Sequence, residues 1–225
     1  MQKKHLQRIG KNFDEKTFEQ LKILWGRVAG KDYVYNDYNK PILNKLMAYF
    51  INDDRVLDYD DLNPFKGIML IGKKGCGKTT ILNNFSKMFD ELKKYCDSNR
   101  ENQIFNRVIL SVSIEKLKSY YLLNNNIEKY SYNVIGDTTY SRPYEIIINE
   151  FGITYDTKIF GTTFQEIINS LLMSRYELFI ERGVLTHVTT NLDTEELKKI
   201  FDPMLVDRFK EMFNIIELKG ESFRK

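Results

Sequence analysis

Two short stretches of the 225-residue sequence combine residue types that could bind and hydrolyse a nucleotide. The first is GKKGCGKTT, residues 72–80, which follows an apolar run and precedes a helical pattern. It matches the phosphate-loop pattern G-x-x-x-x-G-K-[ST] in the strand-to-helix context that the pattern requires. Its glycines allow backbone angles that bring several N–H groups onto one anion, and the following helix adds its positive end. The sequence therefore predicts a site for ATP and Mg²⁺.

Two side chains of this loop have separate predicted tasks. Lys78 would reach the β- and γ-phosphates, and the hydroxyl of Thr79 would be a ligand of Mg²⁺. Cys76 fills a variable position, where a small filler is expected. The predicted nucleotide-binding residues of the loop are Gly72, Lys73, Lys74, Gly75, Cys76, Gly77, Lys78, Thr79 and Thr80.

The second stretch is EIIINEFG, residues 145–152. In P-loop ATPases a later strand ends in an acid that helps to hold Mg²⁺, often followed by an acid that polarises the attacking water. Here Asn149 stands at the first position, as a candidate on the metal side, and Glu150 at the second, as the candidate general base. Because losing an outer-shell partner of a metal typically costs about 10–100-fold, we expect ATP binding to be retained and hydrolysis to be slowed. The alternative is a strand end without a catalytic role.

Strand and helix patterns alternate along the chain, which predicts an α/β fold with a parallel sheet and helices on both faces. Buried strands are expected at 67–71, 107–113, 145–149, 184–190 and 214–220. Helices are expected at 13–27, 41–51, 79–92, 163–182 and 203–212, with a further helix capped by Asp193 or Thr194 and supported by a Glu195–Lys199 pair. Residues 119–143 have weak periodicity and indicate an irregular insertion.

The amino-acid composition is that of an ordinary globular protein, with 42% hydrophobic and 29% charged residues and a net charge of +3. The charge does not demand a nucleic-acid partner. The two cysteines form neither a metal-ligand spacing nor a disulfide framework, and no run approaches the roughly 18 apolar residues of a membrane span. We expect a cytoplasmic protein with no membrane partner. The helix at 13–27 either packs on its own domain or docks on a partner.

Five motifs, in order along the chain, resemble the AAA+ ATPases of the DnaC-type helicase loaders and the related IstB-type transposition ATPases. They are GIMLIGKKGCGKTT, IIINEFG, SRYELFIERGVLTHVTTNL, DRFKEMFN and GESFR. The resemblance covers about residues 35–225. It implies a P-loop AAA+ ATPase domain over 35–225, with a parallel five-stranded sheet and without a helical lid domain, preceded by an N-terminal helical extension over 1–34.

The resemblance also implies roles for single residues. Asn191 would be the sensor that orders the attacking water, and Arg224 the second sensor that reaches the phosphates within its own subunit. Arg208 would be the arginine finger that enters the neighbouring subunit's site, a contribution that can be worth about 10³–10⁵ in rate. Arg175 would be either a second inter-subunit contact or part of a salt bridge on the helix surface. His187, inside a strand, is expected to be a packed residue.

The implied function is an ATP-dependent DNA-replication protein of the helicase-loader type. It would be a homo-oligomer when active, with single-stranded DNA and a replicative helicase or other DNA-processing protein as partners. Lys116 and Lys118 are candidate DNA contacts or solvated helix faces, and Tyr33 to Tyr35 line the adenine or belong to the core. The alternatives are an IstB-like transposition ATPase, a slow or non-hydrolysing nucleotide-gated scaffold, and a small-molecule kinase. The kinase would need an arginine-rich lid that the sequence does not display.

Overall fold

The computed structural model describes residues 11–30, 39–99, 107–131, 143–152, 158–159 and 161–220. The chain forms two compact units. The first contains Met1–Phe65, Gly72–Ile109 and Glu217–Lys225, and the second contains Lys66–Ile71 and Leu110–Ile216.

A five-stranded sheet, formed almost wholly by the second unit, has the strand order β2-β3-β6-β1-β7. Its strands are β1 (Gly67–Ile71), β2 (Ile109–Ser113), β3 (Glu145–Phe151), β6 (Thr186–Thr190) and β7 (Phe213–Glu217). The central strand β6 pairs in parallel with both of its neighbours, and every residue of β1 and β6 is buried. Continuous burial is typical of strands covered on both faces. The predicted α/β fold with a parallel five-stranded sheet is confirmed.

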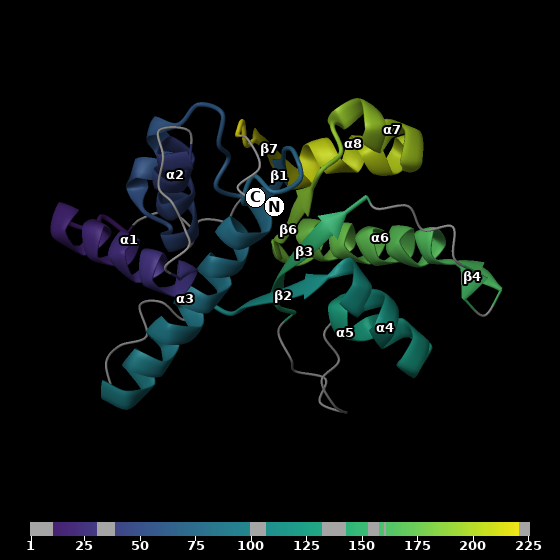
Figure 1. Ribbon diagram of the computed structural model, residues 1–225, viewed down its shortest axis with the longest axis horizontal. Coiled ribbons are helices and arrows are strands. Elements are labelled where there is room, and N and C mark those ends of the chain that lie inside the picture. Colours follow the sequence, from purple (N-terminus) through teal and green to yellow (C-terminus); the bar gives the residue numbers. More distant parts are fainter. Residues whose placement is uncertain are drawn as a thin grey trace. The chain divides into compact units, whose positions relative to one another are not determined.

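Five helices of the second unit surround this sheet (Figure 1). They are α4 (Ile114–Asn124), α5 (Glu128–Ser131), α6 (Phe164–Arg182), α7 (Thr194–Ile200) and α8 (Pro203–Met212). The ends of α6 follow the sequence signals, because Thr163 forms a capping box with Glu166 and Gly183 ends the helix at a φ of +66°. Apolar side chains of α4, α6, α7 and α8 join those of the sheet in one core.

The first unit contains α1 (Glu15–Ala29), α2 (Asn39–Ile51), the 3₁₀-helix η3 (Asp54–Asp58) and α3 (Lys78–Asn99). Helix α1 lies against α3 and buries Phe18, Leu21 and Trp25. The Trp25 ring is 5.7 Å from the ring of Phe85 on α3. The apolar face of α1 is therefore packed on its own unit, which was one of the two alternatives for this helix.

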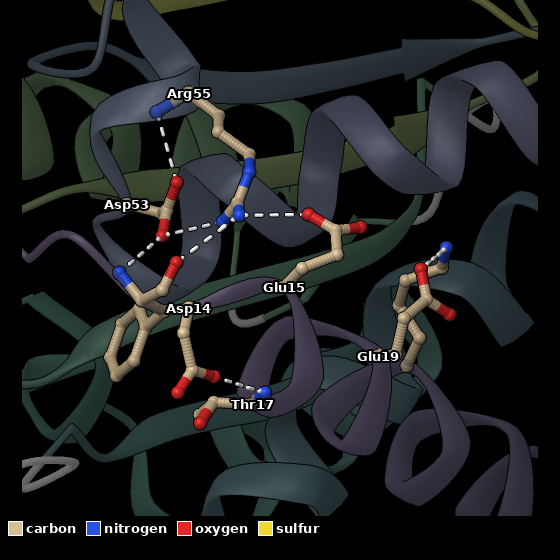
Figure 2. A network of polar contacts seen from close by, with 8 residues as sticks. Asp14, Glu15, Thr17, Glu19, Asp53 and Arg55 are labelled. Atoms are coloured by element: carbon tan, nitrogen blue, oxygen red, sulfur yellow. Dashed lines mark hydrogen bonds and ion pairs between the residues drawn. The ribbon is translucent and has the colours of Figure 1, made fainter.

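A polar network fixes the start of α1 to the segment before η3 (Figure 2). The buried carboxylate of Asp53 accepts hydrogen bonds from the backbone N–H of Phe13 at 3.1 Å and from Arg55 Nη1 at 3.0 Å. Arg55 Nη2 donates to the Phe13 carbonyl and to Glu15, and its guanidinium lies 4.4 Å from the centre of the Phe18 ring. Asp14 caps the helix by accepting from the Thr17 N–H at 2.7 Å. Through their bonds to Phe13 and Glu15, Asp53 and Arg55 fix the start of α1 next to η3.

Several predicted boundaries were wrong. Residues 119–131 are not irregular, because α4 continues to Asn124 and α5 follows; residues 132–142 lie outside the described residues. The Tyr120 and Tyr130 rings pack edge to face at 5.2 Å and tie these two helices together. Helix α3 runs past residue 92 to Asn99, and Glu195 pairs with Lys198 rather than with Lys199. A short hairpin of β4 (Lys158–Ile159) and β5 (Thr162–Thr163) was not predicted.

No helix within the described ranges is both long enough and apolar enough to span a membrane.

Candidate functional site

The loop at residues 72–80 belongs to the first unit and leads directly into α3. Gly75 and Gly77 have φ angles of +89° and +94°, in a region that side chains disfavour. A Cβ added at Gly72 would lie 2.6 Å from the carbonyl oxygen of Leu218 and 3.1 Å from Cys76 Sγ. The loop therefore requires glycine at these positions, as a backbone that wraps an anion does.

Lys78 brings a positive charge into this loop. Its side chain is buried, and Nζ donates hydrogen bonds to the carbonyl oxygens of Gly72 at 2.6 Å and Lys73 at 2.8 Å. Nζ also lies 3.7 Å from the buried Cys76 Sγ, so Cys76 fills space under the loop, as predicted. Thr79 and Thr80 are in the first turn of α3, at the end of the helix that carries a partial positive charge.

These features fit a nucleoside triphosphate with Mg²⁺. The loop has no room for a Cβ at Gly72, an ammonium group lies within it, and a 22-residue helix begins at Lys78 with its positive end at the loop. Thr79 would supply a hydroxyl to the metal. The loop could thus hold the phosphates largely through its own backbone.

Asn149 lies in the second unit, near the carboxyl end of β3, and its side chain is buried. Its Nδ2 donates to the hydroxyl of Ser111 on β2 at 3.0 Å, and its Oδ1 accepts from the hydroxyl of Thr189 on β6 at 3.2 Å. The amide therefore links three adjacent strands of the sheet. Both the nitrogen and the oxygen of the Asn149 amide are thus hydrogen-bonded to hydroxyl groups.

Glu150 is the next residue and is exposed. Its φ angle is +62°, an uncommon value for a residue other than glycine, and its backbone N–H donates to Thr189 Oγ1 at 3.2 Å. Such strained residues cluster at functional sites, where the surrounding structure maintains them. An exposed carboxylate on a fixed backbone could act as a general base toward a substrate.

The carboxyl ends of three strands meet at one edge of the sheet. Ile71, the last residue of β1, pairs with Thr190, the last residue of β6, and Phe151 of β3 pairs with the same threonine. Asn191 follows Thr190 directly and is exposed. Two of the predicted site residues, Glu150 and Asn191, thus lie at this edge. In open α/β sheets, ligands bind outside the carboxyl ends of the strands.

Arg208, on α8, lies against α6 of its own chain. Its guanidinium carbon is 4.7 Å from the centre of the Tyr176 ring, and Nη1 contacts the sulfur of Met173. The hydroxyl of Tyr176 donates to Glu211 on α8 at 2.8 Å, a bond that raises the pKa of the phenol. The side chain of Arg208 is only partly buried, so it is accessible from outside the chain.

Arg175 was predicted at a subunit contact or in a surface salt bridge, and both alternatives are wrong. Its side chain is 0% exposed. Nε donates to Thr186 Oγ1 at 2.9 Å, and the two terminal nitrogens donate to the carbonyl oxygens of Tyr144 and Leu185. Burial lowers the pKa of the guanidinium to about 10, while the carboxylate of Glu145 acts in the opposite direction. The side chain therefore stays charged at neutral pH and joins α6 to the sheet.

His187 is a packed residue, as predicted. Its ring is fully buried, and Nδ1 accepts from the backbone N–H of Ile68 at 3.0 Å. The proton of the neutral ring is therefore on Nε2, which donates to Glu145 Oε1 at 2.5 Å. This histidine joins β1, β3 and β6 and has a structural role.

Two groups of predicted residues lie outside the described residues. They are Arg224, the predicted second sensor, and Tyr33 to Tyr35, the predicted adenine contacts.

The sequence reasoning missed three side chains that contact the candidate site residues. Thr189 and Ser111 hold Asn149, and Tyr176 contacts Arg208. For the first two, the signal in the sequence was a hydroxyl group within a predicted strand, at 107–113 for Ser111 and at 184–190 for Thr189. No signal in the sequence pairs Tyr176 with Arg208, which is 32 residues away (208 − 176).

The chain matches no family model and no curated protein. Among solved structures it is similar to the DnaC helicase loader, with a TM-score of 0.54 and 15% identity over 88% of this chain and 99% of that chain. It is similar to DnaI, with a TM-score of 0.51 and 16% identity over 85% and 87% of the two chains. It also resembles AMPPCP-bound DnaA from Aquifex aeolicus, with a TM-score of 0.52 and 13% identity over 84% of this chain and 49% of that chain. These similarities confirm the AAA+ P-loop fold implied by the sequence motifs.

Proposed function

We propose that this chain is an ATP-dependent DNA-replication protein of the helicase-loader type. The observation that carries the proposal is a complete phosphate loop placed directly after β1 of a sheet with the order β2-β3-β6-β1-β7. The fold similarity to the DnaC helicase loader and to DnaI supports it. AMPPCP-bound DnaA has the same fold, which supports a nucleotide ligand.

In this proposal each of the candidate site residues has a separate role in binding or hydrolysing ATP. Lys78 and the loop N–H groups hold the phosphates, and Thr79 and Asn149 serve the metal side. Glu150 takes a proton from the attacking water, and Asn191 orders that water. Arg224 reaches the phosphates of its own subunit. Bound Mg²⁺ would neutralise part of the phosphate charge.

Arg208 is proposed to act on the nucleotide of a neighbouring copy, which makes the active form a homo-oligomer. The contact of its guanidinium with the Tyr176 ring, at 4.7 Å, is of a kind worth about 0.5–1 kcal/mol at an exposed site. Removing an arginine finger typically costs about 10³–10⁵ in rate, which corresponds to about 4–7 kcal/mol. The contact within the chain is weak, so it would cost little free energy for Arg208 to leave it.

A candidate surface for single-stranded DNA lies on α4 and α5. Lys116 and Lys118 are on α4, and Lys129 of α5 lies 5.6 Å from the ring of Tyr120 and 5.8 Å from that of Tyr130. Basic side chains next to partly exposed aromatic rings are typical of proteins that bind single strands through their phosphates and bases. The proposed cytoplasmic partners are such a strand and a replicative helicase.

The test combines binding with turnover. The chain, ATP and single-stranded DNA are incubated with a replicative helicase in a pull-down, and phosphate release is measured at high protein concentration. We expect capture of the helicase with ATP, loss of capture with Lys78→Ala, and turnover stimulated by single-stranded DNA. Stimulation by duplex DNA alone would favour the IstB-like alternative, and failure to bind ATP would refute the proposal altogether.

A second candidate function is a nucleotide-gated scaffold that barely hydrolyses ATP. Asn149 favours it, because the residue on the metal side carries an amide whose Nδ2 donates to Ser111 and which has no charge to offer Mg²⁺. Tight ATP binding with near-zero turnover in the assembled state would support this alternative.

A further inference from the structure

Strand β3 contains one more residue than β6 at the edge where the candidate site residues lie. Ile148 pairs with Val188 and Phe151 pairs with Thr190, so Asn149 and Glu150 together lie opposite the single residue Thr189. An extra residue of this kind is a β-bulge, which turns side chains and ends regular pairing. Glu150 supplies the left-handed backbone angle, with a φ of +62°.

The bulge decides which side chains enter the core. Ile146, Ile148 and Phe151 all belong to the same buried apolar cluster, although regular alternation would put Phe151 on the opposite face. The residue that alternation would place in that cluster is Glu150, which is instead exposed. The extra residue therefore exchanges a carboxylate for an aromatic ring in the core and directs the carboxylate outward.

One hydroxyl group contacts both residues of the bulge. Thr189 Oγ1 accepts the backbone N–H of Glu150 at 3.2 Å and donates its own proton to Asn149 Oδ1 at 3.2 Å. A hydroxyl has one proton and two lone pairs, so it can make both bonds at once. Asn149 is itself held through Nδ2 by Ser111 at 3.0 Å, which fixes the end of the amide that faces Thr189.

We propose that Thr189 is a positioning residue for hydrolysis: its hydroxyl holds the backbone of Glu150 in the left-handed conformation and thereby directs the Glu150 carboxylate toward the attacking water. This rests on the proposed ATPase function. Thr189 is almost fully buried within β6, so it acts through Glu150 and not on the nucleotide. Valine would fill this position equally well by shape but would lack the hydroxyl that bonds the strained residue.

The test compares Thr189→Val, which keeps the branched shape and removes the hydroxyl, with Thr189→Ser, which keeps the hydroxyl. In the ATPase assay we expect Thr189→Val to lower kcat about 100-fold, because a small misplacement of a reacting group has an effect of that size. The KM for ATP should stay within about twofold, and Thr189→Ser should restore most of kcat. Should Thr189→Val fold poorly, Thr189→Ala removes the hydroxyl without adding a methyl group at its place.

A second readout does not depend on ATP. Hydrogen exchange at the Glu150 amide should be about tenfold faster in Thr189→Val than in the unchanged chain, since the amide loses its acceptor, and nearly normal in Thr189→Ser. If the Glu150 amide exchanges at the same rate in Thr189→Val as in the wild-type chain, the inference is overturned. This holds even if the wild-type chain does not hydrolyse ATP. That lack of hydrolysis alone would count against the proposed function.

Two kinetic outcomes would also overturn the inference. One is a normal kcat in Thr189→Val, which would mean that the held backbone has no catalytic consequence. The other is an equal loss of kcat in Thr189→Ser and Thr189→Val, which would mean that the hydroxyl is not the group that matters.

Discussion

Replacing Asn149 with aspartate tests whether the missing charge limits hydrolysis. In the structure, Asn149 Oδ1 accepts from Thr189 and Nδ2 donates to Ser111. The hydroxyl of Ser111 can turn to donate its proton, so a carboxylate would keep both contacts with little change in shape. The substitution therefore adds a negative charge at an almost unchanged geometry.

The size of the effect follows from where this charge would act. A pair of unit charges about 4 Å apart interacts by about 4 kcal/mol at an effective dielectric constant near 20, which is an upper limit. An outer-shell partner of a metal is typically worth about 10–100-fold, or about 1.4–2.7 kcal/mol. We therefore expect Asn149→Asp to raise kcat about 10–100-fold and to change the affinity for ATP much less. In the absence of ATP and Mg²⁺ the variant should be less stable, because it buries a carboxylate where the chain has a neutral amide.

The assay is phosphate release at saturating ATP and Mg²⁺, with ATP affinity measured separately by a fluorescent analogue. Asn149→Ala is the matched control, since it removes both contacts without adding a charge, and it should lower kcat. Stability is followed by thermal melting with and without Mg²⁺ and ATP. No gain in kcat for Asn149→Asp, in a variant that still binds ATP, would refute the reasoning that the charge on the metal side limits turnover.

Three further substitutions test the framework. Arg175→Met should lower the free energy of unfolding by about 3–5 kcal/mol in urea titrations, because it removes a buried cation near the Glu145 carboxylate and the donor to the carbonyl oxygens of Tyr144 and Leu185. This loss should be constant from pH 6 to 8, since a guanidinium with a pKa of about 10 stays protonated there in both the folded and the unfolded chain. Gly72→Ala would place a Cβ 2.6 Å from the Leu218 carbonyl oxygen, so thermal melting should show a loss of about 1–3 kcal/mol and ATP should bind more weakly. Arg55→Ala should loosen α1, and the fluorescence of Trp25, the only tryptophan, should shift to the red at a lower urea concentration than in the unchanged chain.

The parts of the fold that could be predicted from the sequence are those with a local cause. The apolar run before Gly72 and the glycines after it define a strand and a loop within about 12 residues, and Gly183 marks the end of α6. The parallel five-stranded sheet followed from the resemblance and from the alternation of strands with helices, whereas the order of its strands was not predicted. For these elements local preference and the final packing agree, as they do in well-folding sequences.

The parts that could not be predicted depend on contacts between distant residues. The stretch EIIINEF looks like a regular strand, and only the pairing with β6 reveals that Glu150 is the extra residue of a bulge. Arg175 lies between a serine and a tyrosine on its helix, which does not predict burial, and the carbonyl groups that hold it belong to segments next to the sheet strands. The end of α4 was missed because Tyr120 gains its partner, Tyr130, only through the fold.

The way α1 is anchored has a practical consequence for truncation. A polypeptide that starts at residue 35, where the resemblance to AAA+ proteins starts, would lack Trp25, and Phe85 would lose the packing of that ring while keeping its stack on Phe50. The carboxylate of Asp53 would also lose the backbone N–H of Phe13 that it now accepts. Such a shortened protein would expose apolar side chains of α3 that α1 now covers, and it should aggregate or bind chaperones. Expression of the ATPase part in soluble form therefore requires the first helix to be kept.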